Sequence, residues 1–284
     1  MSHGPKLKPV LGKLIHLFQK SPITPITIGE LELAQQIQEH LLPHHFPFPH
    51  KIEVGTFYKP SKYIGGDFYD VIQIDDRKVA FIIGDVSGNS IPAALFMTQT
   101  LTLLKAFIKM DLSLLKILEK TNQILMDIAK PNMFATVFIS IFDTYYNQLS
   151  YVNAGHNPPL LIRNSLTLTT PDYHPLTMLT AEGIALNCIK PIILEEKRIQ
   201  LYSGDTLLLY TDGLIEVPNV HGEIFGEAKL KGLMTELRGF PAPEIAQKIN
   251  THLETYMQYA LNLPMDVKDD MAAVVIKFKE DEKS

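Results

Sequence analysis

The sequence predicts an α+β fold in which packed antiparallel β-sheets are flanked by helices. Strand-like runs occur in consecutive groups separated by pairs of helices, unlike the one-for-one alternation of a doubly wound parallel sheet. The apolar fraction is 46% and the charged fraction 20%, which are ordinary values for a folded chain of 284 residues. No proline-rich linker divides the chain after Pro49, so we expect residues 30–284 to form a single domain.

The elements are expected in the following order. The apolar spacing predicts a helix over 30–42, with Leu31, Ala34, Ile37, Leu41 and Leu42 on one face and Pro43 ending it. Strands follow at 52–58, 67–74 and 78–83. Two helices come next, near 92–110 and 112–129, the first capped by Ser90 and the second by Asp111 or Ser113. The remaining elements are strands at 134–142, 149–153, 160–163, 192–201 and 206–210, helices at 227–237 and 242–259, and a last strand at 271–278.

Residues 1–29 are expected to form a basic tail and linker. The stretch from Lys6 to Lys20 has the spacing of a short amphipathic helix that contacts a membrane or a partner, although a loosely docked tail is the simpler interpretation. It has no small-residue cleavage pattern, which argues against a signal peptide. No uninterrupted apolar run reaches the roughly 20 residues of a transmembrane helix. The single cysteine, Cys188, fits a reducing compartment, so we expect a cytoplasmic protein.

The charge balance excludes some classes of function. There are 26 basic and 31 acidic residues, giving a net charge of −5. Binding to a nucleic-acid backbone needs a concentrated basic surface, so nucleic acid is not expected as a partner. One cysteine also excludes a thiolate-rich zinc site.

Four aspartates stand at the ends of apolar strands: Asp67, Asp85, Asp212 and Asp269, the last followed by Asp270. A carboxylate at such a position is costly to desolvate, and four that converge would repel one another without cations. Two divalent cations would balance four negative charges, and an all-oxygen set selects Mg²⁺ or Mn²⁺. Two such ions roughly 3.5–4 Å apart can activate a water and bind a phosphoryl oxygen. The alternative interpretation is that each aspartate simply makes a turn.

An ordered set of motifs runs from about Ala34 to Phe278. The motifs are Ala34-x-x-Ile37-Gln38-x-x-Leu41-Leu42-Pro43, Gly65-Gly66-Asp67-Phe68-Tyr69-Asp70, Gly84-Asp85-Val86-Ser87-Gly88, Pro92-Ala93-Ala94-Leu95, Met133-Phe134-Ala135-Thr136, Asn153-Ala154-Gly155-His156-Asn157-Pro158-Pro159, Gly204-Asp205, Leu209-Tyr210-Thr211-Asp212-Gly213-x-x-Glu216 and Asp269-Asp270-Met271. With this set the chain resembles the bacterial PP2C-like serine/threonine phosphatases of the SpoIIE/RsbU type, which regulate sigma factors. One motif alone is a weak signal, whereas the ordered set is highly specific.

The resemblance implies an αββα sandwich with a dinuclear Mn²⁺ or Mg²⁺ centre between the sheets. By position, Asp85 would bridge both ions with help from the Val86 carbonyl, Asp67 would bind one ion, and Asp212 and Asp269 the other. The supporting residues would be Gly66, Asp270 and His156. The family hydrolyses phosphoserine or phosphothreonine by direct attack of metal-bound hydroxide, so Asp85 and Asp212 are the expected catalytic residues.

Other residues leave alternatives open. His156 would either donate a proton to a phosphate or leaving oxygen, or brace its loop by hydrogen bonding, and the bracing role is preferred. The chain departs from the family pattern at Ser90 and Asn187, where glycine is usual, and at Ala272, where threonine is common.

The resemblance also indicates a partner. The expected substrate is a phosphorylated bacterial regulatory protein similar to an anti-anti-sigma factor. Control is expected from a separate partner or from a homodimer formed through the helix at Leu31–Leu42. The alternative is a catalytically weak or inactive module of the same fold that only binds such a partner. A phosphodiesterase or nuclease using the same metals is less favoured, because the sequence lacks a basic substrate groove.

Overall fold

The computed structural model describes residues 26–130, 132–164, 175–258 and 269–279. The amphipathic segment predicted between Lys6 and Lys20 lies outside the described residues.

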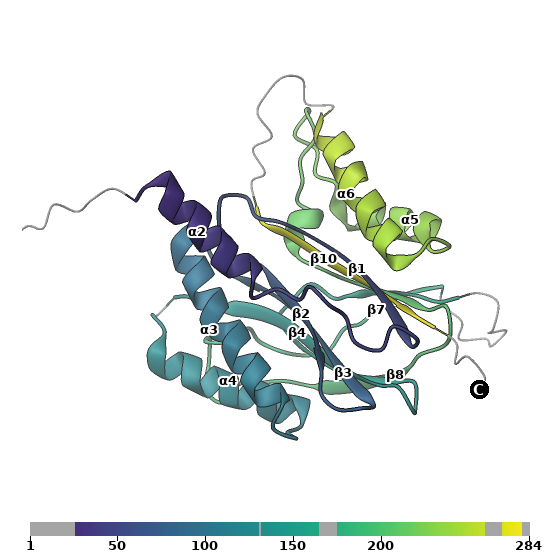
Figure 1. The fold of residues 1–284 in the computed structure, drawn as a ribbon, viewed down its shortest axis with the longest axis horizontal. Coiled ribbons are helices and arrows are strands. Elements are labelled where there is room, and N and C mark those ends of the chain that lie inside the picture. The colour runs from purple at the N-terminus through teal and green to yellow at the C-terminus, as the bar shows by residue number, and fades with distance from the viewer. Residues whose placement is uncertain (1–25, 131, 165–174, 259–268, 280–284) are drawn as a thin grey trace, which may run out of the picture.

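Two five-stranded antiparallel sheets pack against each other (Figure 1). The first sheet has the strand order β1 (Ile52–Lys59), β10 (Met271–Phe278), β9 (Thr206–Tyr210), β6 (Leu160–Ile162) and β7 (Leu176–Met178). The second has the order β2 (Phe68–Gln73), β3 (Lys78–Val86), β4 (Ala135–Asp143), β5 (Gln148–Ala154) and β8 (Glu196–Gln200). The core between them is apolar and includes aromatic rings: the ring of Phe278 lies 4.9 Å from that of Phe142 and 6.4 Å from that of Phe81.

Helix pairs cover the outer faces of both sheets. Helices α3 (Ser90–Ile108) and α4 (Leu114–Ile128) pack on the second sheet, and α5 (Gly226–Leu237) and α6 (Ala242–Gln258) pack on the first (Figure 1). The alternation of β9 explains how one strand serves two layers. Leu207 and Leu209 join the core between the sheets, while Leu208 and Tyr210 pack under α5 and α6. The predicted αββα sandwich is confirmed.

Helix α3 is the one described helix that is long and apolar enough to cross a membrane, judged by length and composition alone. In this fold it packs against the second sheet, with Met97, Leu101 and Leu104 fully buried. Lys105 places its ammonium 2.6 Å from the carboxylate of Asp70 on β2. These contacts are those of a core helix.

Helix α2 (Ile28–Glu39) differs from its prediction at both ends and in its packed face. It begins two residues early, because Thr27 and Glu30 form a capping box in which each side chain accepts the other residue's backbone N–H. The expectation that Ile37 shares the packed face is wrong, since this side chain is 60% exposed. The buried residue of the helix is Gln38.

The other elements match their predictions closely, with a few differences. Strand β8 is shorter than the predicted 192–201, and β7 was not predicted. Ser113 caps α4 as expected, by accepting the N–H of Lys116. The expectation that Ser90 caps α3 is wrong: Asn89 occupies the N-cap position, without a side-chain capping hydrogen bond, and Ser90 is the first helical residue, with a φ of 65°. Asn187 has a φ of 66°. Both positions thus have the left-handed backbone that favours the glycine usual in the family.

Candidate metal centre

The four predicted aspartates come from four separate segments that meet at one end of the sandwich. Asp67 precedes β2 and Asp85 lies at the end of β3; Phe68 pairs with Gly84, which makes the two aspartates neighbours in the second sheet. Asp212 follows β9 and Asp269 precedes β10, the next strand of the first sheet. Each sheet therefore contributes one pair of carboxylates.

The carboxylates perturb one another. Burial, followed by the charges of Asp212 and Asp269, raises the pKa of Asp85 to about 7. Burial and the charge of Asp85 raise the pKa of Asp67 well above its usual value. Burial is also the first cause of the raised pKa values of Asp212 and Asp269. Ionising all of these carboxylates together is unfavourable because their negative charges repel one another. A positive charge nearby would offset this repulsion.

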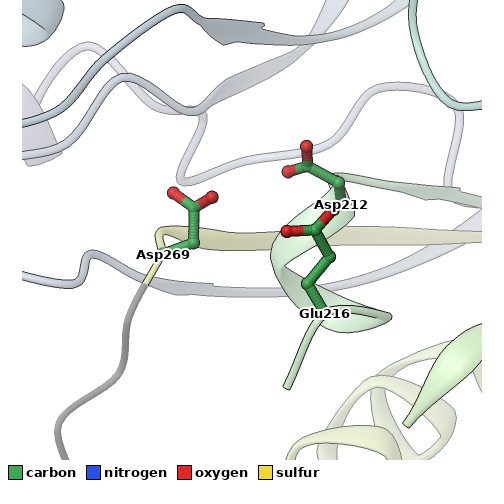
Figure 2. Close-up of side chains that lie close together, drawn as sticks. All are labelled: Asp212, Glu216 and Asp269. Carbon is green, nitrogen blue, oxygen red and sulfur yellow. The ribbon is translucent and has the colours of Figure 1, made fainter. Parts of the chain in front are cut away.

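A fifth carboxylate, Glu216, joins the cluster. Asp212, Glu216 and Asp269 each offer a carboxylate oxygen within 4.8 Å of the others, and Figure 2 shows the three side chains close together. The 3-10 turn η1 (Asp212–Leu214) causes this, because the Glu216 N–H donates to the Asp212 carbonyl and brings position i+4 back over position i. Glu216 is not among the ligands predicted from the sequence, although its spacing of four residues from Asp212 is a signal that could have placed it beside that residue.

Asp270 faces the loop before β2. Its carboxylate accepts hydrogen bonds from the Ser61 N–H at 2.7 Å, the Ser61 hydroxyl at 2.9 Å and the Gly66 N–H at 2.6 Å. It therefore ties the first sheet to the segment that carries Asp67. The neighbouring Asp269 accepts the Asp270 N–H at 2.9 Å.

Two glycines allow the close approach of backbone at the site. A side chain at Gly66 would place its Cβ 2.9 Å from the Val86 carbonyl oxygen, the backbone atom expected to assist Asp85. A side chain at Gly213 would overlap the backbone of Asp270. Both positions therefore require the smallest residue.

His156 is buried and linked to both sheets. One ring nitrogen, Nδ1, lies 2.9 Å from the Thr136 hydroxyl on β4, and Nε2 lies 3.1 Å from the Tyr210 carbonyl on β9. A carbonyl only accepts, so Nε2 carries the hydrogen and Nδ1 accepts from Thr136. Burial lowers the pKa of His156 to about 4, which keeps the ring neutral at pH 7. Because both nitrogens are engaged, the geometry favours the bracing role.

The donor set fits a divalent cation. The cluster consists of carboxylates, which are oxygen ligands that Mg²⁺ and Mn²⁺ prefer. The raised pKa values of the buried carboxylates fit the same interpretation, because a bound cation favours their ionised forms.

The αββα sandwich places the protein in the class with the PP2C-type phosphatase fold. The SiaA-PP2C domain of Pseudomonas aeruginosa superimposes with a TM-score of 0.75 at 20% identity, covering 88% of this chain and 96% of that chain. The PP2C phosphatase domain of SpoIIE from Bacillus subtilis superimposes with a TM-score of 0.67 at 21% identity, covering 82% and 63%. Residues 75–279 match the family model of stage II sporulation protein E (SpoIIE), and the chain belongs to this family.

Curated relatives agree with this assignment. The chain is 28% identical to protein IcfG of Synechocystis sp. over 72% of its length, and 24% identical to the phosphoserine phosphatase RsbU of Bacillus subtilis over 88%. It spans 36% of the length of IcfG and 70% of RsbU. A further structural neighbour, RsbX, was solved in complex with magnesium, with a TM-score of 0.58 at 18% identity over 81% of this chain and 96% of that chain.

Proposed function

We propose that this protein is a protein serine/threonine phosphatase that depends on two Mn²⁺ or Mg²⁺ ions. The observation that carries the proposal is the convergence of Asp67, Asp85, Asp212 and Asp269, which lie in four separate segments of the sequence, at one end of the sandwich. Membership of the SpoIIE family supports the same activity.

The residues divide the work as follows. Asp85, assisted by the Val86 carbonyl, would be a ligand to both ions, Asp67 would hold one ion, and Asp212 and Asp269 would hold the other. When bound, the ions lower the pKa of a water molecule and stabilise negative charge on the phosphoryl oxygens. Glu216 adds negative charge beside Asp212 and Asp269.

The supporting residues maintain this arrangement. Asp270 and Gly66 fix the loop before β2, and His156 fixes the end of β9 beside Asp212.

The proposed substrate is a phosphoserine or phosphothreonine on a regulatory protein similar to an anti-anti-sigma factor. The relatives RsbU and RsbP of Bacillus subtilis are named phosphoserine phosphatases, which supports this class of substrate.

The proposed organisation has a cytoplasmic phosphatase domain at 30–284 that forms a homodimer through the helix at Leu31–Leu42. The N-terminal residues 1–29 would be a tail able to contact a membrane. Leu33 and Ile37 support the dimer, because both are more than half exposed and lie four residues apart on α2.

The test is the release of inorganic phosphate from a serine-phosphorylated regulator of this type, with Mn²⁺ and with EDTA. Wild type is compared with Asp85→Asn and Asp212→Asn. Asp76→Asn is the matched control, because it removes the same charge from an exposed turn. We expect both site variants to lose activity by about 10²–10³-fold, the effect of removing one group that stabilises the transition state. The control should keep full activity.

Other outcomes contradict the proposal in distinct ways. Turnover that persists in both site variants would exclude the metal mechanism. Binding of the phosphorylated regulator without turnover would indicate the inactive binding module. Hydrolysis of bis(p-nitrophenyl) phosphate but not of the phosphoserine would indicate a phosphodiesterase.

A further inference from the structure

A single hydroxyl group joins the two halves of the carboxylate cluster. Thr211 lies between the last residue of β9 and Asp212, and it is completely buried. Its Oγ1 atom lies 2.6 Å from Oδ2 of Asp67, a residue 144 positions earlier that leads into the other sheet. The residue adjacent to one predicted ligand thus contacts another predicted ligand across the sandwich.

The direction of this hydrogen bond follows from the other contacts of Thr211. The backbone N–H of Ala272 donates to Oγ1 at 2.9 Å, which uses a lone pair of the hydroxyl. The carbonyl of Ala272 is 3.5 Å from the same atom, too far to compete with a carboxylate at 2.6 Å. An ionised Asp67 has only acceptors, so the hydroxyl proton goes to Asp67.

The hydroxyl itself is held in place. The Thr211 N–H donates to the Ala272 carbonyl at 3.1 Å, so Thr211 and Ala272 exchange hydrogen bonds through both backbone and side chain. Hydrogen bonds to Ala272 on the neighbouring strand β10 thus fix the hydroxyl. A donor fixed in this way can orient the carboxylate that it contacts, as residues that hydrogen-bond to metal ligands do.

We infer that Thr211 is a positioning residue: it orients Asp67 for cation binding and links Asp67 to the segment that carries Asp212. The inference rests on the metal centre of the proposed function, but it does not depend on which phosphate ester is hydrolysed. Thr211 donates to Oδ2 of Asp67, so Oδ1 of the same carboxylate takes no part in this hydrogen bond. The alternative is that the hydroxyl merely satisfies its own buried hydrogen bonds, in which case its loss would affect stability and not cation affinity.

The experiment measures Mn²⁺ affinity by calorimetry and by the paramagnetic resonance signal of free Mn²⁺. Thr211→Val keeps the shape and removes the hydroxyl, whereas Thr211→Ser keeps the hydroxyl. Thr121→Val is the matched control, because Thr121 is equally buried but donates to a carbonyl of its own helix, α4. The unfolding temperature in EDTA is recorded for every variant.

Thr211→Val is expected to weaken Mn²⁺ binding by about 10–100-fold, the range found for outer partners of metal ligands. Thr211→Ser is expected to bind as wild type does. Thr121→Val should lower the unfolding temperature without changing the affinity.

Two results would overturn the inference. If Thr211→Val binds Mn²⁺ like wild type, Thr211 has no positioning role; should this variant fail to fold, Thr211→Ala gives the same comparison. If wild type itself binds no Mn²⁺, the metal centre is wrong and this inference fails with it. Wild type that binds Mn²⁺ but releases no phosphate contradicts only the proposed function, and the comparison at Thr211 still decides the inference.

Discussion

The side-chain amide of Gln38 binds both backbone groups of Gly65. Its Nε2 donates to the Gly65 carbonyl at 2.7 Å, and its Oε1 accepts the Gly65 N–H at 3.0 Å. Gly65 lies two residues before Asp67, so helix α2 directly contacts the loop that carries a predicted ligand. The position of α2 and the geometry of this loop are therefore linked.

Replacing Gln38 should disturb both stability and the site. Gln38→Ala leaves a buried N–H and a buried carbonyl of Gly65 unpaired, which costs about 2–4 kcal/mol in the free energy of unfolding. We also expect weaker Mn²⁺ binding, because the loop before Asp67 loses its anchor. Chemical denaturation and calorimetry measure the two effects. Gln36→Ala, an exposed change on the same helix, should stay within about 0.5 kcal/mol of wild type. Unchanged stability and affinity in Gln38→Ala would show that the contact does not matter.

The exposed apolar residues of α2 should mediate self-association. Leu33 is 57% exposed and Ile37 lies one turn further along the same side. We expect the double variant Leu33→Glu/Ile37→Glu to convert a dimer into a monomer in sedimentation or light scattering, because the new charges must be desolvated. Gln36→Glu introduces a single negative charge at an exposed position beside these two residues and should remain dimeric. A monomeric wild type at high concentration contradicts the expectation.

The contribution of Asp85 to stability without metal should fall as the pH rises. The pKa of Asp85 is about 7 in the folded protein and near 3.8 when unfolded. The stability that protonated Asp85 contributes to the folded state is therefore fully present below about pH 4 and is lost as the pH rises through 7. In EDTA, the slope for this one carboxyl reaches about 1.4 kcal/mol per pH unit. Asp85→Asn should flatten the slope, exceed wild type in stability at pH 8, and lose the stabilisation by Mn²⁺. An Asp85→Asn profile that matches wild type would exclude this account, and Asp76→Asn serves as the control.

His156 should give a pH dependence of the opposite sign. Its pKa is about 4 when folded and 6.5 in the unfolded chain, so its contribution is complete above 6.5 and is lost as the pH falls toward 4. The difference in unfolding free energy between wild type and His156→Gln should shrink over this range by up to about 1.4 kcal/mol per pH unit. His221→Gln, in an exposed loop, should change nothing. A constant difference for His156→Gln would mean that the ring titrates normally.

Ser90 should be a site of strain that glycine relieves. A left-handed backbone costs a residue with a side chain roughly 1–2 kcal/mol, which glycine avoids. Glycine is also more flexible in the unfolded chain, and this offsets about 0.5–1 kcal/mol of the stabilisation. Ser90→Gly should therefore stabilise the protein by about 0.5–1 kcal/mol in denaturation experiments. Asn187→Gly should gain less, because the Asn187 amide donates to the Met133 carbonyl at 2.7 Å. Equal effects at the two positions would contradict this explanation.

The strongly patterned parts of the fold could be predicted from the sequence. Strands β9 and β10 begin and end at the predicted residues, because apolar runs bounded by turn residues mark both ends. Strand β7 has three residues and, among the residues that the structure describes, pairs with β6 alone, so it is too short to show a period. The start of α2 was missed because the capping box of Thr27 and Glu30 was not used.

The candidate site was predicted only where single residues carried a signal. The aspartates stand out because a charge beside an apolar strand is costly. Thr211 and Gln38 have no such signal: a buried threonine and a glutamine on a helix are ordinary until the fold places them against Asp67 and Gly65. Their roles depend on contacts across the sandwich, which no local pattern contains.

The place of β10 in the first sheet has a consequence for synthesis on the ribosome. This strand is the last described one in the chain, yet it lies between β1 and β9 and directly follows Asp269 and Asp270. A nascent chain that has not yet emerged past these residues lacks the strand that joins β1 to β9 in the first sheet. Translation that stalls before β10 should therefore leave an aggregation-prone intermediate whose β1 and β9 have unpaired edges.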